Sequence, residues 1–88
     1  MKTVQQDFIK AKVNIHVTPG TMLKTIRELQ GLSQSQLADL TGISQANISA
    51  IETDTRRLGR ERALVLARAL KVHPAVILFP DFTMEEVA

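Results

Sequence analysis

Apolar residues recur every three to four positions from about residue 18 onward, which is the spacing of helices that bury one face. Five short helices are predicted on this basis, over residues 19–30, 34–40 and 45–53, from about 59 through 70, and 74–79. Because none of these is long enough to be stable in isolation, packing of their apolar faces must hold them in place. The sequence therefore predicts an all-α domain.

Residues that start and stop helices mark the boundaries between these segments. Thr18, Ser33 and Ser44 each stand where a side-chain oxygen would cap the helix that follows. Gln36 lies three positions after Ser33 and completes a capping box. Gly42 supplies a tight turn with a left-handed backbone, so a β-branched residue there is expected to be strained and to clash between the two flanking helices.

The apolar stripes also predict the core. Eighty-eight residues suffice for one domain with one modest core. The residues expected on the buried faces are Met22, Leu23, Ile26 and Leu29 in the first helix, Ala63, Leu66, Ala67 and Leu70 in the fourth, and Val76, Ile77 and Phe79 in the fifth, which would close the core.

Residues 34–53 are the most informative part of the chain. Two short helices meet there at Gly42, and Ala38 is small where the first must pass close to the second. The apolar positions in this segment have the spacing that packs one helix across the other; they are Leu37, Ile43, Ile48 and Ile51. This combination is the pattern of a DNA-binding helix-turn-helix, whose second helix enters the major groove.

The first seventeen residues have a different periodicity. Val13, Ile15 and Val17 alternate with polar residues, as in a strand, and a lone strand needs a partner for its backbone. The same strand of a second copy is the simplest partner; the alternative is an extended or disordered arm pinned by Phe8 and Ile9. We therefore divide the chain into an arm (1–17), a DNA-binding domain (18–80) and a flexible tail (81–88).

Composition and charge narrow the function further. The net charge is only +2, but four arginines follow the second helix of the pair, at positions 56, 57, 60 and 62. They predict contacts with phosphates, and the alternative is a solvated loop and helix start. The absence of cysteine, of a secretory signal and of any apolar run longer than the five residues 75–79 favours a cytoplasmic protein that does not contact a membrane.

Residues 23–79 resemble the Cro/CI (Xre-type) family of five-helix DNA-binding domains. The matching segments are 32–38 (LSQSQLA), 41–52 (TGISQANISAIE) and 66–72 (LARALKV). Two positions depart from the family pattern, because Asp54 replaces a usual glycine and Leu58 a usual proline. Asp54 is suited to the left-handed backbone expected there, although the loop after the second helix is expected to differ in shape.

The resemblance also implies which residues contact DNA. Gln34 matches a residue that contacts a phosphate and braces the recognition helix, and Gln45 matches the first base-reading position. The amide of Gln45 offers the donor and acceptor that pair with adenine, and the alternative is an exposed residue without a role. The full set of candidates is Gln34, Ser44, Gln45, Ala46, Asn47, Ser49, Ala50, Arg56 and Arg57.

Arg27 and Glu52 match a family pair that joins the first helix to the end of the recognition helix. A bridge between them would orient that helix while adding little net stability. The alternative is two surface charges that point into water.

A repressor or autoregulator that binds a double-stranded DNA operator as a homodimer is the function this sequence favours. The alternative is an antitoxin, which would neutralise a small toxin protein through residues 1–17 or the tail and repress its own operon. No catalytic residue, cofactor or metal site is expected, because His16 and His73 stand in no nucleophile or metal-ligand spacing.

Overall fold

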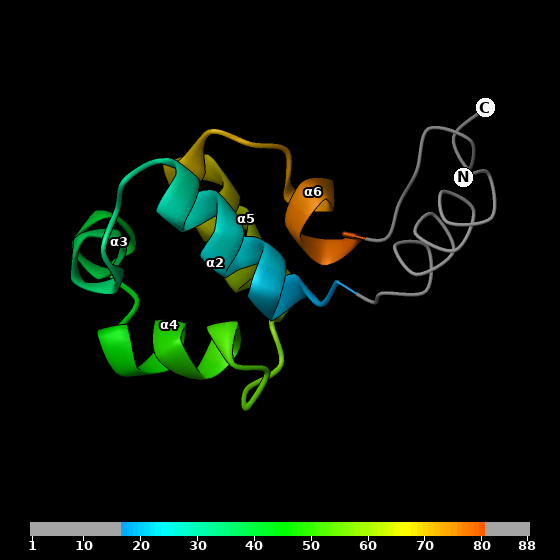
Figure 1. The fold of residues 1–88 in the computed structure, drawn as a ribbon, viewed down its shortest axis with the longest axis horizontal. Helices are drawn as coiled ribbons and strands as arrows, with labels where there is room; N and C mark the ends of the chain where they lie inside the picture. The colour runs from blue at the N-terminus through cyan, green and yellow to red at the C-terminus, as the bar shows by residue number, and fades with distance from the viewer. Residues whose placement is uncertain (1–16, 81–88) are drawn as a thin grey trace, which may run out of the picture.

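The computed structural model describes residues 17–80 as five helices joined by short connections (Figure 1). They are α2 (Pro19–Leu29), α3 (Gln34–Thr41), α4 (Gln45–Glu52), α5 (Arg60–Leu70) and α6 (Pro74–Leu78). The described part of the chain contains no strand, so the predicted all-α, five-helix class is confirmed. The predicted boundaries hold to within one or two residues, since α2 ends at Leu29 and α4 at Glu52.

The predicted capping residues form hydrogen bonds at the starts of α2, α3 and α4. The Thr18 hydroxyl accepts a hydrogen bond from the backbone N–H of Thr21, and Ser33 and Gln36 complete the second capping box. The Ser44 hydroxyl accepts from the N–H of Asn47. Each of these bonds satisfies a backbone donor that the first turn of a helix leaves without a partner, so these three starts are fixed locally by the sequence.

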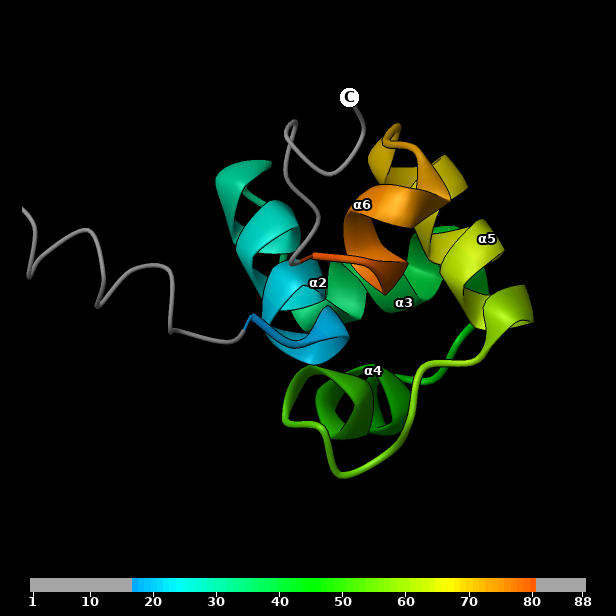
Figure 2. The ribbon, with the colours of Figure 1, turned by 90° about the vertical axis from the view of Figure 1, so that its right-hand side faces the viewer.

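The core lies where the five helices meet (Figure 2). Helix α2 packs on α4 and α6, α3 packs on α4 and α5, and α5 packs on α6. The buried apolar side chains are Leu23, Ile26, Leu37, Ile48, Ile51, Leu58, Ala63, Leu66, Ala67, Leu70 and Ile77. The whole predicted face of α5 is therefore buried, and Leu58, one of the two residues that depart from the family pattern, belongs to the core.

Three residues expected in the core are largely exposed instead. Leu29 is 81% exposed, because the last turn of α2 directs Ile26 and Arg27 inward and Leu29 lies to one side of that face. In α6 only Ile77 is buried, whereas Val76 is 43% and Phe79 63% exposed. A helix of five residues makes little more than one turn, so it turns only one apolar side chain fully inward. Val76 and Phe79 therefore form part of the surface.

Gly20 marks a close approach that the sequence analysis did not anticipate. A Cβ atom at this position would overlap the carbonyl oxygen of Ile51 and stand 3.0 Å from that of Glu52. Asp54, which has the expected left-handed backbone (φ 61°), accepts a hydrogen bond from the Thr18 hydroxyl at 2.8 Å. The start of α2 is thus joined directly to the end of α4.

Gly42 has the left-handed backbone that was expected (φ 78°) and ends α3. The predicted clash at this position is wrong, because a Cβ atom there would meet no atom within 4 Å. The turn faces solvent, so only the backbone conformation requires glycine.

The strand-like segment and the tail lie outside the described residues, except for Val17, which belongs to no helix. None of the described helices has the length and apolar character needed to cross a membrane.

Candidate nucleic-acid interface

Helices α3 and α4 form a helix-turn-helix around Gly42. The inner faces of both helices are anchored in the core, since Leu37, Ile48 and Ile51 are almost completely buried. Ala38 and Ile43 pack against the same core and are partly buried. Helix α4 lies along one edge of the molecule, beyond α2 and α5 (Figures 1 and 2). Its outer face is therefore open to a ligand as large as a DNA duplex.

The candidate residues of α4 lie on this open side. Ser44, Gln45 and Ala46 are exposed, and the more central candidates, Asn47, Ser49 and Ala50, are partly exposed. This distribution follows from helical periodicity, because Ile48 and Ile51 on the same helix face the core. All these candidates are at least partly exposed, and we call this exposed part of α4 the strip on α4.

The side chain of Gln45 contacts the helix before it. The Ser35 hydroxyl donates to Gln45 Oε1 at 3.1 Å, which leaves Gln45 Nε2 free to donate outward. Ser35 was not among the predicted residues. The contact joins side chains ten positions apart and depends on how α3 and α4 cross, so no local pattern in the sequence could have indicated it.

A buried ion pair connects α2 to the end of α4. Arg27 Nε and Nη2 donate to the two oxygens of Glu52 at 2.7 and 2.9 Å, and the side chains are only 8% and 2% exposed. The hydrogen bond to Glu52 raises the pKa of Arg27 despite the opposing effect of burial. The structure therefore excludes the alternative of two charges pointing into water.

Two further groups complete this network. Arg27 Nη1 donates to the carbonyl oxygen of Leu32 at 2.7 Å, between α2 and α3. Gln34 Nε2 donates to Glu52 Oε1 at 3.0 Å. Gln34, at the first position of α3, thus contacts the last residue of α4, and the network holds three helices in a fixed relation.

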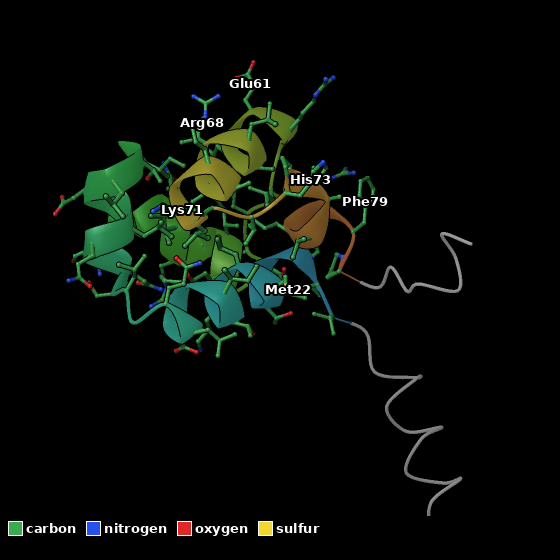
Figure 3. All side chains as sticks on the ribbon, turned by 90° about the horizontal axis from the view of Figure 1, so that it is seen from above. Met22, Glu61, Arg68, Lys71, His73 and Phe79 are labelled. Atoms are coloured by element: carbon green, nitrogen blue, oxygen red, sulfur yellow. The ribbon has the colours of Figure 1, made fainter. Side chains whose placement is uncertain are left out.

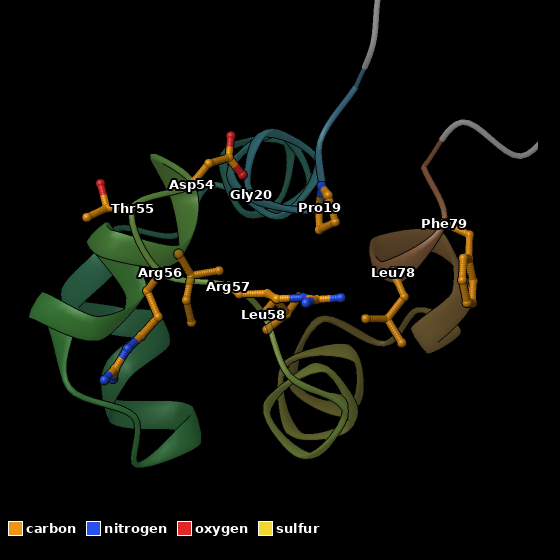
Figure 4. A pocket seen from close by; sticks show the side chains of 10 residues that line it. Pro19, Gly20, Asp54, Thr55, Arg56, Arg57, Leu58, Leu78 and Phe79 are labelled. Carbon is orange, nitrogen blue, oxygen red and sulfur yellow. The ribbon is translucent and has the colours of Figure 1, made fainter.

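Two of the four arginines predicted to contact phosphates, Arg56 and Arg57, diverge although they are adjacent. Arg56 Nη1 donates to Asn47 Oδ1 at 2.8 Å, so this side chain lies beside α4. Arg57 points the other way, into a groove of about 560 Å³ between the loop, the start of α2 and α6 (Figure 4). Of the two, Arg56 lies next to the strip on α4.

The described residues contain no group of three or more histidine, cysteine, aspartate or glutamate side chains that could hold a metal ion. His73 caps α6, its Nδ1 atom accepting from the backbone N–H of Ala75 at 3.0 Å. This agrees with its position before a proline at a helix start.

The fold and this surface together define a helix-turn-helix protein of the Cro/CI type. Residues 23–77 match the model of the helix-turn-helix family HTH_3, so the chain belongs to that family.

Similar proteins agree with this assignment. The chain is 28% identical over 86 residues to the uncharacterized HTH-type transcriptional regulator y4aM of Sinorhizobium fredii; the match covers 94% of the chain and spans only 60% of that regulator. Among solved structures, the P22 c2 repressor in complex with a synthetic operator has a TM-score of 0.68 at 25% identity, over 73% of this chain and 97% of that one. The restriction-modification controller protein C.AhdI from Aeromonas hydrophila has a TM-score of 0.66 at 32% identity, over 68% and 91%. These three proteins are named as a transcriptional regulator, a repressor and a controller protein.

Proposed function

We propose that this chain is a transcriptional repressor or autoregulator that places α4 in the major groove of a specific operator. The proposal rests on the strip on α4, which includes Gln45. The helix is held in place by the hydrogen-bonded network of Arg27, Glu52 and Gln34. A rigid helix with polar and small residues outward fits a groove that exposes base edges. A protein with this function would act in the cytoplasm.

Gln45 is the residue to which we assign direct base reading. With Oε1 occupied by Ser35, the free Nε2 group matches an acceptor in the major groove, such as N7 of a purine or O4 of thymine. If the Ser35 contact breaks on binding, the amide regains the bidentate pairing with adenine expected from the sequence. Ala46, one position later and equally exposed, is suited to contact a thymine methyl group.

Phosphate contacts would hold α4 in position. The first turns of α3 and α4 both present backbone N–H groups, which favour an anion, and Gln34 and Ser44 stand at these two starts. Arg56 lies beside α4 and adds a positive charge there. Asn47 holds the Arg56 side chain, so these two residues would act together, while Ser49 and Ala50 face the duplex from the later turns of α4.

A dimer is part of the proposal, because one α4 helix makes too few base contacts for a selective operator. Residues 1–17 are the first candidate for the dimer contact. The second is the surface around α6, where Met22, His73, Val76 and Phe79 line a groove of about 320 Å³, and three of these residues are labelled in Figure 3. Ile77, the neighbour of Val76 in α6, is fully buried and cannot contribute.

The antitoxin alternative stays a prediction from the family resemblance. Co-expression with the product of the neighbouring reading frame tests it. A stable complex that relieves the toxicity of that product would favour the antitoxin, and separate purification of the two proteins would favour a stand-alone regulator.

The test of the proposal compares two substitutions on DNA selected by this protein from random duplexes. Gln45→Ala should weaken binding to the selected sequence by about 1–3 kcal/mol and relax selectivity at one base pair. Arg56→Ala should weaken binding to selected and scrambled DNA alike and lower the salt dependence. Equal weakening of both DNAs by Gln45→Ala would contradict base reading by this residue.

A further inference from the structure

The groove that receives Arg57 combines a positive charge with an apolar wall. Its lining includes Pro19, Leu58, Leu78 and Phe79, and the Arg57 side chain extends among them (Figure 4). Asp54 also lines the groove, but its carboxylate accepts from the Thr18 hydroxyl at the start of α2. Within residues 17–80 no acceptor is hydrogen-bonded or ion-paired to the Arg57 guanidinium.

The segment that follows α6 has the complementary chemistry. Residues 81–88 contain Asp81, Glu85 and Glu86 and no lysine or arginine, so the segment carries three negative charges. Its second residue, Phe82, is an aromatic side chain that suits an apolar wall. The segment starts two positions after Phe79, which lines the groove, and eight residues reach at most about 29 Å when extended. Every part of the groove is within that distance.

We propose that residues 81–88 bind in this groove, with a carboxylate of the segment paired to Arg57 and Phe82 against Leu58 and Leu78. Attachment to α6 raises the effective concentration of the segment to about the millimolar range, so the ion pair and the contact of Phe82 together need only provide a dissociation constant of about 1 mM. The sequence alone predicts a loose tail, whereas under this proposal the segment binds in the groove of the protein without DNA.

The contact would regulate DNA binding. The sequence predicts that Arg57 contacts a phosphate, for which its side chain would have to leave the groove. A guanidinium paired with the segment stays there, so the acidic residues and the DNA backbone compete for Arg57. This consequence rests on the proposed function, although the contact itself does not. The segment would lower non-specific affinity most, because that affinity is almost entirely electrostatic.

The first experiment uses the full chain without DNA. The Nε–H resonance of Arg57 is measured by NMR in the wild type and in the triple variant Asp81→Asn/Glu85→Gln/Glu86→Gln. A matched control removes three exposed carboxylates elsewhere, as Glu28→Gln/Asp39→Asn/Glu61→Gln. We expect the resonance to shift only in the first variant. An unmoved resonance, or an equal shift in the control, would overturn the proposal.

The second experiment measures affinity for scrambled DNA at several salt concentrations. Neutralising the segment should raise affinity about threefold to tenfold and steepen the salt dependence by about one counterion. The gain should vanish when Arg57→Gln is already present, and a gain that persists would show that the charges act without Arg57. If the NMR shift occurs but no variant binds DNA, the contact stands and the proposed function fails.

Discussion

Removal of Arg27 should cost a substantial part of the stability of this domain. Arg27→Met keeps an unbranched side chain but leaves the carboxylate of Glu52, whose side chain is 2% exposed, with only the Gln34 amide as a side-chain partner. Breaking a buried ion pair from one side costs about 3–5 kcal/mol, because a buried charge is left without compensation. Small domains have total stabilities of about 5–15 kcal/mol. The sequence suggested a larger effect on DNA binding than on stability; the burial seen here reverses that order.

Urea denaturation followed by circular dichroism measures the cost. The partner variant Glu52→Leu and the double variant complete a double-mutant cycle. The double variant should recover much of the loss, since no buried charge remains, while the Leu32 carbonyl and Gln34 still lack partners. A loss below about 1 kcal/mol for Arg27→Met, as for an exposed pair, would show that the Glu52 carboxylate is not left buried without compensation.

The same cycle separates orientation from stability. If the network orients α4, the double variant should bind selected DNA more weakly than the wild type at temperatures where both are folded. The loss of stability caused by Arg27→Met should be constant between about pH 6 and 9 as far as it depends on Arg27, because the guanidinium stays protonated over that range. Its pKa is raised in the folded state, so the stability gained from its charge is complete below the unfolded-state pKa and is lost only in strong alkali.

Three further predictions concern the backbone and the arm. Gly20→Ala should destabilise the domain by about 1–3 kcal/mol in thermal melting, because Cβ would overlap the Ile51 carbonyl oxygen. Gly59→Ala is the control, since a Cβ atom there meets nothing within 4 Å. Equal melting temperatures of the two variants would contradict the close approach at Gly20. Gly42→Val should cost about 1–3 kcal/mol through backbone strain alone, whereas Gly42→Asn should cost much less, so equal losses would show that φ is not the cause. Deletion of residues 1–17 should favour the monomer in sedimentation and lower operator affinity while the helical domain stays folded. If the truncated protein remains dimeric, the dimer contact is assigned instead to the surface around Val76 and Phe79.

The helix boundaries could be predicted because they depend on neighbouring residues. The caps at Thr18, Ser33 and Ser44 are made by side chains that bond their own first turns. The left-handed backbones at Gly42 and Asp54 likewise follow from residue type. Local chemistry of this kind is readable without knowledge of the fold.

The parts that could not be predicted depend on how helices approach each other. The overlap that forbids a side chain at Gly20 exists only because α2 crosses the end of α4. The contact of Ser35 with Gln45 and the opposite directions of Arg56 and Arg57 have the same origin. Periodicity failed at Phe79, because a single helical turn does not define a face.

Selection of bound duplexes from a random pool by the full chain tests directly whether this helix-turn-helix recognises a particular DNA sequence. The proposed function predicts enrichment of one sequence with two half-sites related by a two-fold axis, about 34–36 Å apart or a multiple of that distance. Selection with Gln45→Ala should lose preference at one position in each half-site. A pool that stays random after repeated rounds, with affinity governed only by salt, would contradict sequence-specific binding by this helix-turn-helix.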